Sequence, residues 1–358
     1  MVKTAAFASG DADVARLATN VFRQARDWKQ MEFAAQQWRS RSLDRPAEAD
    51  VAIAEAQLAQ GNAAGAVAQL APHASGATAS PDANAAVLIM YARALAAAGR
   101  EGEARGLLEP LLPKSPRWRN AWMSIVETDV KDAATATAWL EHVAPRVMTD
   151  TKDEQLALAR AWHGVGGRFQ QPAAHEAAAK VLLPLADAPD AGVDVLLLFA
   201  SVLQATGDLP AAEANYRKAL ALRPEQPLAM NNLAYLLLAR DGGAGGNLAD
   251  ARALSEKAVA LAPSVAPFHD TLARIRFKSG DRDGALDSFQ RALDLEPDLV
   301  DAMIGKASVF SALGDASAVR EMLRRIDATL PRKPNLSTEL KRELELARTS
   351  ANATVDTR

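Results

Sequence analysis

The stretch Ala219-Leu220-Ala221-Leu222-Arg223-Pro224 recurs along the chain, as Ala258-Val259-Ala260-Leu261-Ala262-Pro263 and as Ala292-Leu293-Asp294-Leu295-Glu296-Pro297. The prolines that close the second and third copies are 34 residues apart, and Pro331 follows after another 34. A fixed period of this size is typical of helical repeats, each a pair of antiparallel helices. The spacing therefore predicts an all-α solenoid of about nine helical hairpins.

Residues 193–226 form the clearest unit. Apolar residues from Leu196 to Leu203 are three and four apart, as one buried helix face requires. Gly207-Asp208 predicts a turn, because glycine adopts the left-handed conformation that ends a helix and aspartate caps the next one. Tyr216 is expected to fill the gap to the next hairpin. Small side chains that let the two helices approach closely are expected at Ala200, Ala212 and Ala219.

The order of small residue, Gly-Asp turn, small residues, Tyr216 and Pro224 resembles the tetratricopeptide repeat. This resemblance implies a right-handed superhelix of helical hairpins with a concave groove, lined by the first helix of each hairpin. It also implies that the groove binds an extended peptide or a helix of a partner protein. The expected groove positions are Asp194, Leu197, Ser201, Asn231, Tyr235, Asp270, Arg274, Phe277 and Ser308.

The pattern divides the chain into segments of different regularity. Residues 1–192 hold weaker copies; in the copy at 151–192 Gly166 is in place, with a turn expanded over Arg168–Pro172. Charged, amphipathic residues 334–348 are predicted to form a capping helix, and polar residues 349–358 a flexible tail. The well-matched repeats occupy 193–226, 227–265, 266–299 and 300–333.

Two more specific resemblances concern the partner. Asn231–Leu238 and His269–Ala273 are similar to repeats of bacterial envelope proteins associated with exopolysaccharide production and protein sorting. Members that hold the C-terminal carboxylate of a chaperone use a five-residue clamp of Lys, Asn and Arg. Only Asn232 matches that clamp, since Pro267 and Thr271 stand where the family has Lys and Arg. A chaperone-tail adaptor is therefore not expected.

The sequence lacks recognisable catalytic, phosphate-binding and metal-binding motifs. The glycine-rich run Asp241–Asn247 lacks the Gly-Lys-Ser/Thr of a phosphate-binding loop and is interpreted as a loop insertion. The five histidines contain no His-x-x-x-His pair, and the chain has no cysteine. Glu343 and Glu345 are interpreted as solvated helix surface. We expect no enzymatic activity, no metal and no cofactor.

Composition limits the partners and leaves the compartment open. A net charge of −3 with a pI near 6.0 gives no electrostatic case for nucleic acid. No segment approaches the roughly 18 apolar residues of a membrane span. Met1–Gly10 contains too few apolar residues for a signal-peptide core, so a cytoplasmic location is expected. A periplasmic location is the alternative if the sequence is part of an exported protein.

The function expected from these observations is a non-catalytic scaffold or adaptor that binds a partner protein in its groove. Two alternatives stay open. One is a regulatory or targeting module of a larger envelope, exopolysaccharide or secretion complex, and the other is a homo-oligomeric, self-assembling scaffold. The six tryptophans all lie between Trp28 and Trp162, where they either fill gaps between repeats or mark a binding face.

Overall fold

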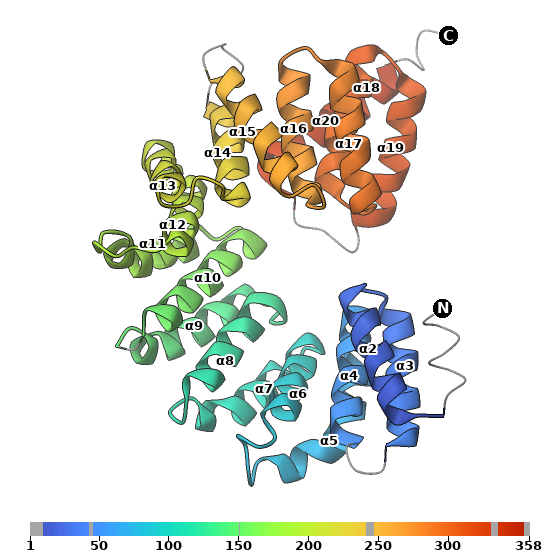
Figure 1. Cartoon of the computed structure of the whole chain (residues 1–358), viewed down its shortest axis with the longest axis vertical. Coiled ribbons are helices and arrows are strands. Elements are labelled where there is room, and N and C mark those ends of the chain that lie inside the picture. The colour runs from blue at the N-terminus through green and yellow to red at the C-terminus, as the bar shows by residue number, and fades with distance from the viewer. Residues whose placement is uncertain (1–9, 43–45, 150, 241–246, 331–335, 354–358) are drawn as a thin grey trace. The chain divides into compact units, whose positions relative to one another are not determined.

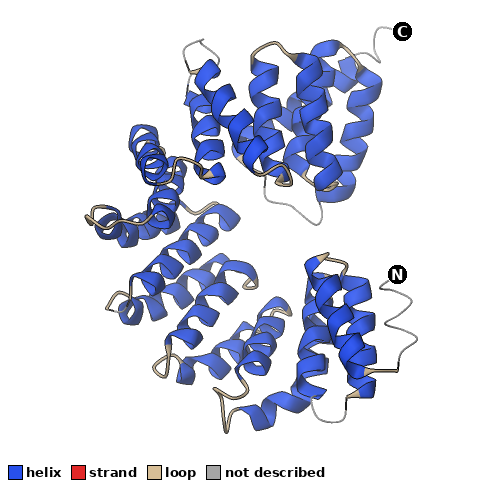
Figure 2. Cartoon of the chain, in the orientation of Figure 1, coloured by secondary structure: helices blue, strands red, loops and turns tan. Residues whose placement is uncertain are grey.

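The computed structural model describes residues 10–42, 46–149, 151–240, 247–330 and 336–353. Within these ranges every regular element is a helix, which confirms the predicted all-α class (Figure 2). The predictions made for the N-terminal segment 1–9, the glycine-rich run 241–246, Pro331 and the tail beyond residue 353 fall outside the described residues. The chain divides into two compact units, residues 1–181 and 182–358.

Unit 1 contains successive helices that run from blue to green in Figure 1. The last of them, α11, crosses the boundary between the units. Their bounds are α2 (Ala12–Gln24), α3 (Trp28–Arg41), α4 (Pro46–Ala59), α5 (Ala63–Ala77), α6 (Ala85–Ala97), α7 (Glu101–Leu108), the 3₁₀ turn η1 (Glu109–Leu111), α8 (Pro116–Thr128), α9 (Ala133–Val147), α10 (Lys152–Phe169) and α11 (Pro172–Ala186).

Unit 2 also consists of successive helices. The described α-helices of the whole chain form nine successive pairs, from α2 with α3 to α18 with α19, followed by α20. The bounds in unit 2 are α12 (Val193–Thr206), α13 (Leu209–Leu222), α14 (Pro227–Arg240), α15 (Leu248–Leu261), α16 (Ala266–Lys278), α17 (Arg282–Leu295), α18 (Val300–Leu313), α19 (Ala316–Thr329) and α20 (Thr338–Ala353).

The predicted Gly-Asp turns are confirmed. Gly207 ends α12 with φ of +89°, a conformation that strains residues with a Cβ atom. The Asp208 carboxylate then accepts a hydrogen bond from the backbone N–H of Ala211 at 3.2 Å and so caps α13. The same pair of roles recurs where α18 meets α19, at Gly314 and Asp315. These turns reverse the chain and set each hairpin.

The turn after α10 falls within the expected span Arg168–Pro172, but Gly166 itself lies inside the helix. Helix α10 continues through Gly166 to Phe169 and ends at Gln170, whose φ is +53°. The glycine has a packing role instead, since a Cβ atom there would lie 2.6 Å from Nδ1 of His175. A buried imidazole ring therefore occupies the space that a side chain at Gly166 would need.

Close helix packing in the repeat of α12 and α13 follows the prediction. Ala200, Ala212 and Ala219 are completely buried. Tyr216 is also buried, and its hydroxyl donates to Oε1 of Gln204 at 3.2 Å. Burial raises the pKa of this hydroxyl to about 12, although hydrogen bonds with Asn232 and Ser201 oppose the shift. Because Asn232 lies on α14, Tyr216 joins its own hairpin to the next one.

The tryptophans of unit 1 fill the core, so the gap-filling interpretation holds for most of them. Trp118 and Trp122 are fully buried and Trp139 nearly so, while Trp28 is partly exposed. The rings of Trp122 and Trp139 lie with centroids 4.3 Å apart, and Nε1 of Trp122 donates to the Trp139 carbonyl at 2.8 Å. Each indole N–H needs such a partner when it is buried.

Buried charges in unit 1 are paired across helices. Arg119 of α8 donates through Nε to the Glu154 carboxylate of α10 at 2.7 Å, and both side chains are almost fully buried. The fully buried Asp50 of α4 binds Arg39 of α3 at 2.6 Å and His73 of α5 at 2.6 Å. Because an unpaired buried charge is costly, these contacts fix which helices lie together.

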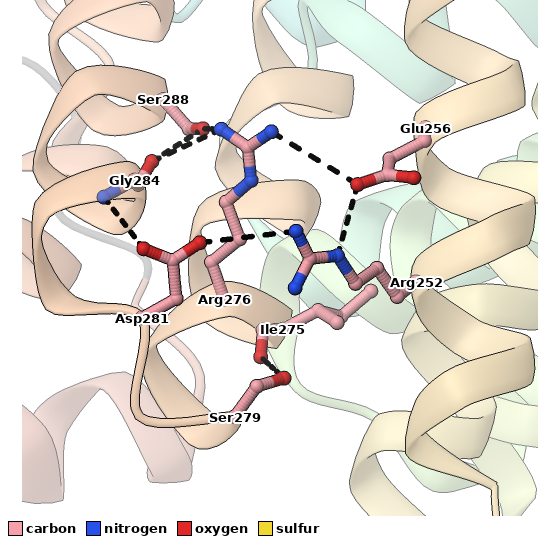
Figure 3. Close-up of polar contacts among 8 residues, drawn as sticks. All are labelled: Arg252, Glu256, Ile275, Arg276, Ser279, Asp281, Gly284 and Ser288. Carbon is pink, nitrogen blue, oxygen red and sulfur yellow. Dashed lines mark hydrogen bonds and ion pairs between the residues drawn. The ribbon is translucent and has the colours of Figure 1, made fainter.

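A polar network joins α15, α16 and α17 in unit 2 (Figure 3). Arg276 of α16 donates to the Gly284 carbonyl at 3.2 Å and to the Ser288 hydroxyl at 2.8 Å, both on α17. Its other terminal nitrogen lies 4.0 Å from Glu256 of α15, which also accepts from Arg252 at 2.9 Å. The network therefore connects one repeat to the next.

The C-terminal helix is longer than the sequence predicted. The capping helix was expected to end at residue 348, but α20 continues to Ala353. The extra turn is stabilised by packing, because Ala351 is buried in a cluster with Ala307 of α18 and with Val319 and Met322 of α19. Small residues in this weakly apolar stretch were read as a tail because their burial depends on tertiary contacts.

Candidate interaction site

A cavity of about 370 Å³ opens in unit 2 between the first helices of three repeats and the C-terminal helix. We call it the Arg274 cavity. Helices α14, α16, α17, α18 and α20 all contribute to its wall. Its lining residues are Tyr235, Leu238, Ala239, Arg274, Phe277, Lys278, Phe289, Gly305, Ser308, Glu339, Glu343 and Leu346.

Arg274 is the most highly connected side chain of this cavity. Its Nε donates to Oδ2 of Asp270 at 3.0 Å, one helical turn earlier on α16. Its Nη1 lies 3.1 Å from both carboxylate oxygens of Glu343 on α20, and its Nη2 donates to the Asp301 carbonyl of α18 at 2.9 Å. One guanidinium thus links three helices, a geometry that its rigid, forked donors favour.

The environment of Arg274 shifts two pKa values. Burial by itself would lower the pKa of Arg274, but the carboxylates of Asp270 and Glu343 raise it. Burial raises the pKa of the Asp270 carboxyl, and Arg274 opposes that shift. Oδ1 of Asp270 is buried and accepts no hydrogen bond from the described residues. Arg274 is therefore held as a cation, and it stabilises carboxylates placed beside it.

Aromatic residues provide the apolar part of the cavity. Tyr235 keeps 36% of its surface exposed. Burial is the main cause that raises the pKa of its hydroxyl, and the Glu339 carboxylate adds to the shift. Phe277 is partly buried against the core formed by α16, α17 and α18. A ligand here would meet a ring face, a phenol and a cation within one short stretch of surface.

The cavity brings together four of the residues predicted to line the groove, namely Tyr235, Arg274, Phe277 and Ser308. Asp270 lies behind Arg274 and is 9% exposed. Asn231 and Leu197 are each 7% exposed, because neighbouring helices cover them. On α12, Asp194 is exposed and Ser201 is partly buried. The first-helix positions are therefore not equally accessible.

Residues of α20 in the cavity were missed from the sequence. Glu343 was interpreted as solvated surface, which is wrong because it forms an ion pair with Arg274; Glu345 is exposed, as expected. Glu339 and Leu346 also line the cavity. The available signal was the Glu-Leu pairs at 339–340 and 343–344, whose four-residue spacing places both acids on one side of a helix.

In the described part of the chain, no group of three or more His, Cys, Asp or Glu side chains comes together to hold a metal ion. Two histidines do meet in unit 1: Nδ1 of His163 lies 3.0 Å from Nδ1 of His175. Burial, with a smaller contribution from His175, lowers the pKa of His163 to about 4. Among the described helices, none combines the length and apolar character needed to cross a bilayer.

One hairpin of unit 2 matches a known family. A model of the tetratricopeptide repeat matches residues 193–226, which comprise α12 and α13. These residues are a tetratricopeptide repeat. The repeat carries the Gly207-Asp208 turn and the buried alanines described above, and the helix pairs that follow it pack in the same successive order.

Comparisons with solved structures found similar chains of low sequence identity. The tetratricopeptide repeat protein TTC0263 of Thermus thermophilus is 20% identical, over 56% of this chain and 100% of that chain, with a TM-score of 0.46. MamA from Desulfovibrio magneticus is 20% identical over 49% and 96%, with a TM-score of 0.39. An O-GlcNAc transferase of Thermobaculum terrenum is 27% identical over 37% and 26%, with a TM-score of 0.34. A search of curated proteins found no match.

Proposed function

We propose that this chain is a non-catalytic scaffold that binds a partner protein through the Arg274 cavity of unit 2. The observation that carries the proposal is the combination of exposed Tyr235, partly buried Phe277 and the cation Arg274 in one cavity built by three successive repeats. Aromatic and arginine side chains in partly desolvated pockets supply most of the binding energy at protein interfaces. The helices that hold them are already formed, so little ordering cost opposes binding.

The first helices α14, α16 and α18 supply the surface, and we infer that residues 193–333 are the interacting segment. The overall charge of −3 favours a protein partner over nucleic acid. A helix or an extended peptide suits a cavity whose walls come from parallel elements one repeat apart. The binding residues we assign are Tyr235, Phe277, Lys278 and Ser308, with Arg274 as the anchor for a carboxylate.

The test compares variants of the full chain against purified partners. Candidate partners are captured from cells, purified, and titrated calorimetrically with each variant. We expect Tyr235→Ala and Lys278→Glu to weaken binding at least tenfold, which corresponds to about 1.4 kcal/mol. Lys257→Glu is the matched control, because it makes the same charge change on an exposed site of α15 that does not line the cavity. Wild-type affinity of both cavity variants for every purified partner would remove this surface from the interaction.

A further inference from the structure

Helix α20 reaches farther back along the repeats than a simple cap needs to. It packs on α18 and α19, the last pair of the array, as a terminal helix does. Its Glu343 also binds Arg274 of α16, and Glu339 contributes with Tyr235 of α14 to the same cavity wall. Figure 1 shows α20 overlapping α16 to α18 within unit 2, in agreement with these contacts. The helix therefore packs on α18, binds α16 through Glu343, and borders a cavity that α14 also lines.

The contacts of α20 follow an order along its length. Leu340 and Leu344 of α20, together with Leu336 just before the helix, pack into a core cluster that also contains residues of α16, α17, α18 and α19. Ala347 and Ala351 pack, farther along, against α18 and α19. The spacing of three and four residues makes one apolar stripe, and Glu339 and Glu343 each directly precede a leucine of that stripe. The result is an amphipathic helix that presents Glu339 and Glu343 to a cationic and aromatic surface.

This seat is incompletely filled. Beside α20 the Arg274 cavity keeps a volume of about 370 Å³, Tyr235 keeps 36% of its surface exposed, and Leu346 on α20 is 62% exposed at the cavity wall. Arg274 depends on α20 for one of its two carboxylates, while Asp270 on its own helix supplies the other. A helix that replaces α20 must therefore supply a carboxylate in place of Glu343. Without one, the buried charge of Arg274 would be paired with Asp270 alone.

We propose that α20 is an intramolecular ligand of this surface, and that the partner is an amphipathic helix that presents a glutamate or aspartate and competes with α20 for Arg274. The proposal rests on the proposed function and specifies the chemistry of the partner. When a partner helix displaces α20, its carboxylate and its apolar stripe replace those of α20. The free-energy cost of displacement is therefore small compared with that of unfolding a repeat. Access to the surface is then set by how tightly α20 holds its own site.

The first experiment measures how tightly α20 is held, by amide hydrogen exchange in the full-length chain. Glu343→Gln removes the carboxylate bound to Arg274, and we expect the amides of α20 to exchange at least tenfold faster than in the wild type. Glu345→Gln is the matched control, since Glu345 lies on the exposed side of the same helix. Equal exchange in Glu343→Gln, Glu345→Gln and the wild type would show that α20 is a fixed packing element, and would overturn the proposal.

The second experiment supplies the helix in trans. A labelled peptide of residues 336–353 is titrated into each full-length variant. We expect it to bind Glu343→Gln at least tenfold more tightly than the wild type, because it returns the missing carboxylate. A peptide that itself carries glutamine at position 343 should lose this gain, and so should a chain that combines Glu343→Gln with Arg274→Met. Equal binding of both peptides would contradict the role of Arg274.

Neither experiment uses a partner protein, so their failure is distinct from failure of the proposed function. A fixed α20 together with weakened partner binding by Tyr235→Ala would leave the scaffold and exclude the competition. A mobile α20 together with unaltered partner binding would leave α20 as an intramolecular ligand of this surface and exclude the surface as the partner's binding site. If Glu343→Gln loses its helical circular dichroism, Glu343→Asp takes its place, because the shorter side chain keeps its charge but reaches less far toward Arg274, and the amides of α20 are again expected to exchange faster than in the wild type.

Discussion

At the scale of the residue, one missing Cβ atom sets the distance between neighbouring repeats. Gly305 of α18 faces the ring of Phe289 on α17, and a Cβ atom at position 305 would lie 2.5 Å from Cε1 of that ring. Phe289 is completely buried, so a methyl group at position 305 would have to displace its ring. Both residues line the Arg274 cavity, and the close approach of α17 and α18 is therefore part of how the cavity is built.

Gly305→Ala is expected to destabilise the chain by roughly 1–3 kcal/mol, because overpacking a filled core shifts side chains and backbone. Urea unfolding followed by circular dichroism measures the change. Gly106→Ala is the control, since a Cβ atom there meets nothing within 4 Å and lies within helix α7. That control should be neutral or slightly stabilising. Equal stability of the two variants would mean that the Phe289 ring accommodates the methyl group.

The imidazole pair of His163 and His175 makes unit 1 sensitive to acid. The pKa of His163 is lowered from 6.5 to about 4, because the folded chain buries the ring next to His175. The neutral ring is thus favoured in the folded state. This contribution to stability is fully present above pH 6.5, and it is lost as the pH falls toward 4.

The free energy of unfolding is expected to fall by about 2 kcal/mol more in the wild type than in His163→Gln when the pH is lowered from about 7.5 to about 5. Urea titrations of both proteins at the two pH values give this difference directly. His163→Gln keeps a polar side chain of similar size but cannot be protonated in this range. The same pH dependence in both proteins would assign the acid sensitivity to other groups.

At the scale of the element, buried ion pairs decide which helices lie together. Arg119 of α8 and Glu154 of α10 are 7% and 1% exposed, and Arg119 also donates to the Leu112 carbonyl at 2.9 Å. Removing one partner of such a pair leaves a buried charge without compensation. Exposed pairs such as Arg100 with Glu103 exchange protein contacts for water at little cost.

Glu154→Gln is expected to lower the stability of unit 1 by roughly 3 kcal/mol. Glu103→Gln makes the same substitution in an exposed pair of α7, and it should cause no measurable change. Thermal unfolding by calorimetry compares the two variants with the wild type. An unchanged transition in Glu154→Gln would show that the remaining partners of Arg119 compensate its charge.

The elements also show how far sequence reasoning reaches. The apolar spacing and the Gly-Asp turns predicted the helix pairs of unit 2, because both signals are local. The length of α10 and the seat of α20 could not be predicted in this way. The packing role of Gly166 depends on a histidine of the following helix, and the ion pair of Glu343 depends on an arginine 69 residues earlier in the chain. A single sequence does not record such partners.

At the scale of the whole molecule, each helix pair contacts mainly its neighbours in the chain. The stability of a repeat array is approximately a sum of local terms, so damage in one region need not spread. The groove expected along α12 to α18 was predicted from the repeat resemblance, and four of its nine assigned residues line one cavity. The accessible part of that surface was not predictable, because it depends on α20.

Glu154→Gln should therefore accelerate amide exchange in α8 and α10 while α16 and α18 keep their wild-type protection. Hydrogen exchange read by mass spectrometry resolves these helices in one experiment. The reason is that Arg119 and Glu154 bind each other, and Arg119 also binds the Leu112 carbonyl, all within unit 1. A loss of protection throughout both units would indicate that the chain unfolds as one cooperative body.

The placement of the tryptophans has an optical consequence. All six lie between Trp28 and Trp162, in unit 1, and Trp118, Trp122 and Trp139 are buried in its core. Indole emission therefore monitors the first half of the chain alone. The native sequence has no cysteine, so a single engineered thiol in the second half would accept one dye without side reactions. Recording tryptophan and dye fluorescence in one thermal unfolding experiment would then follow the two halves separately.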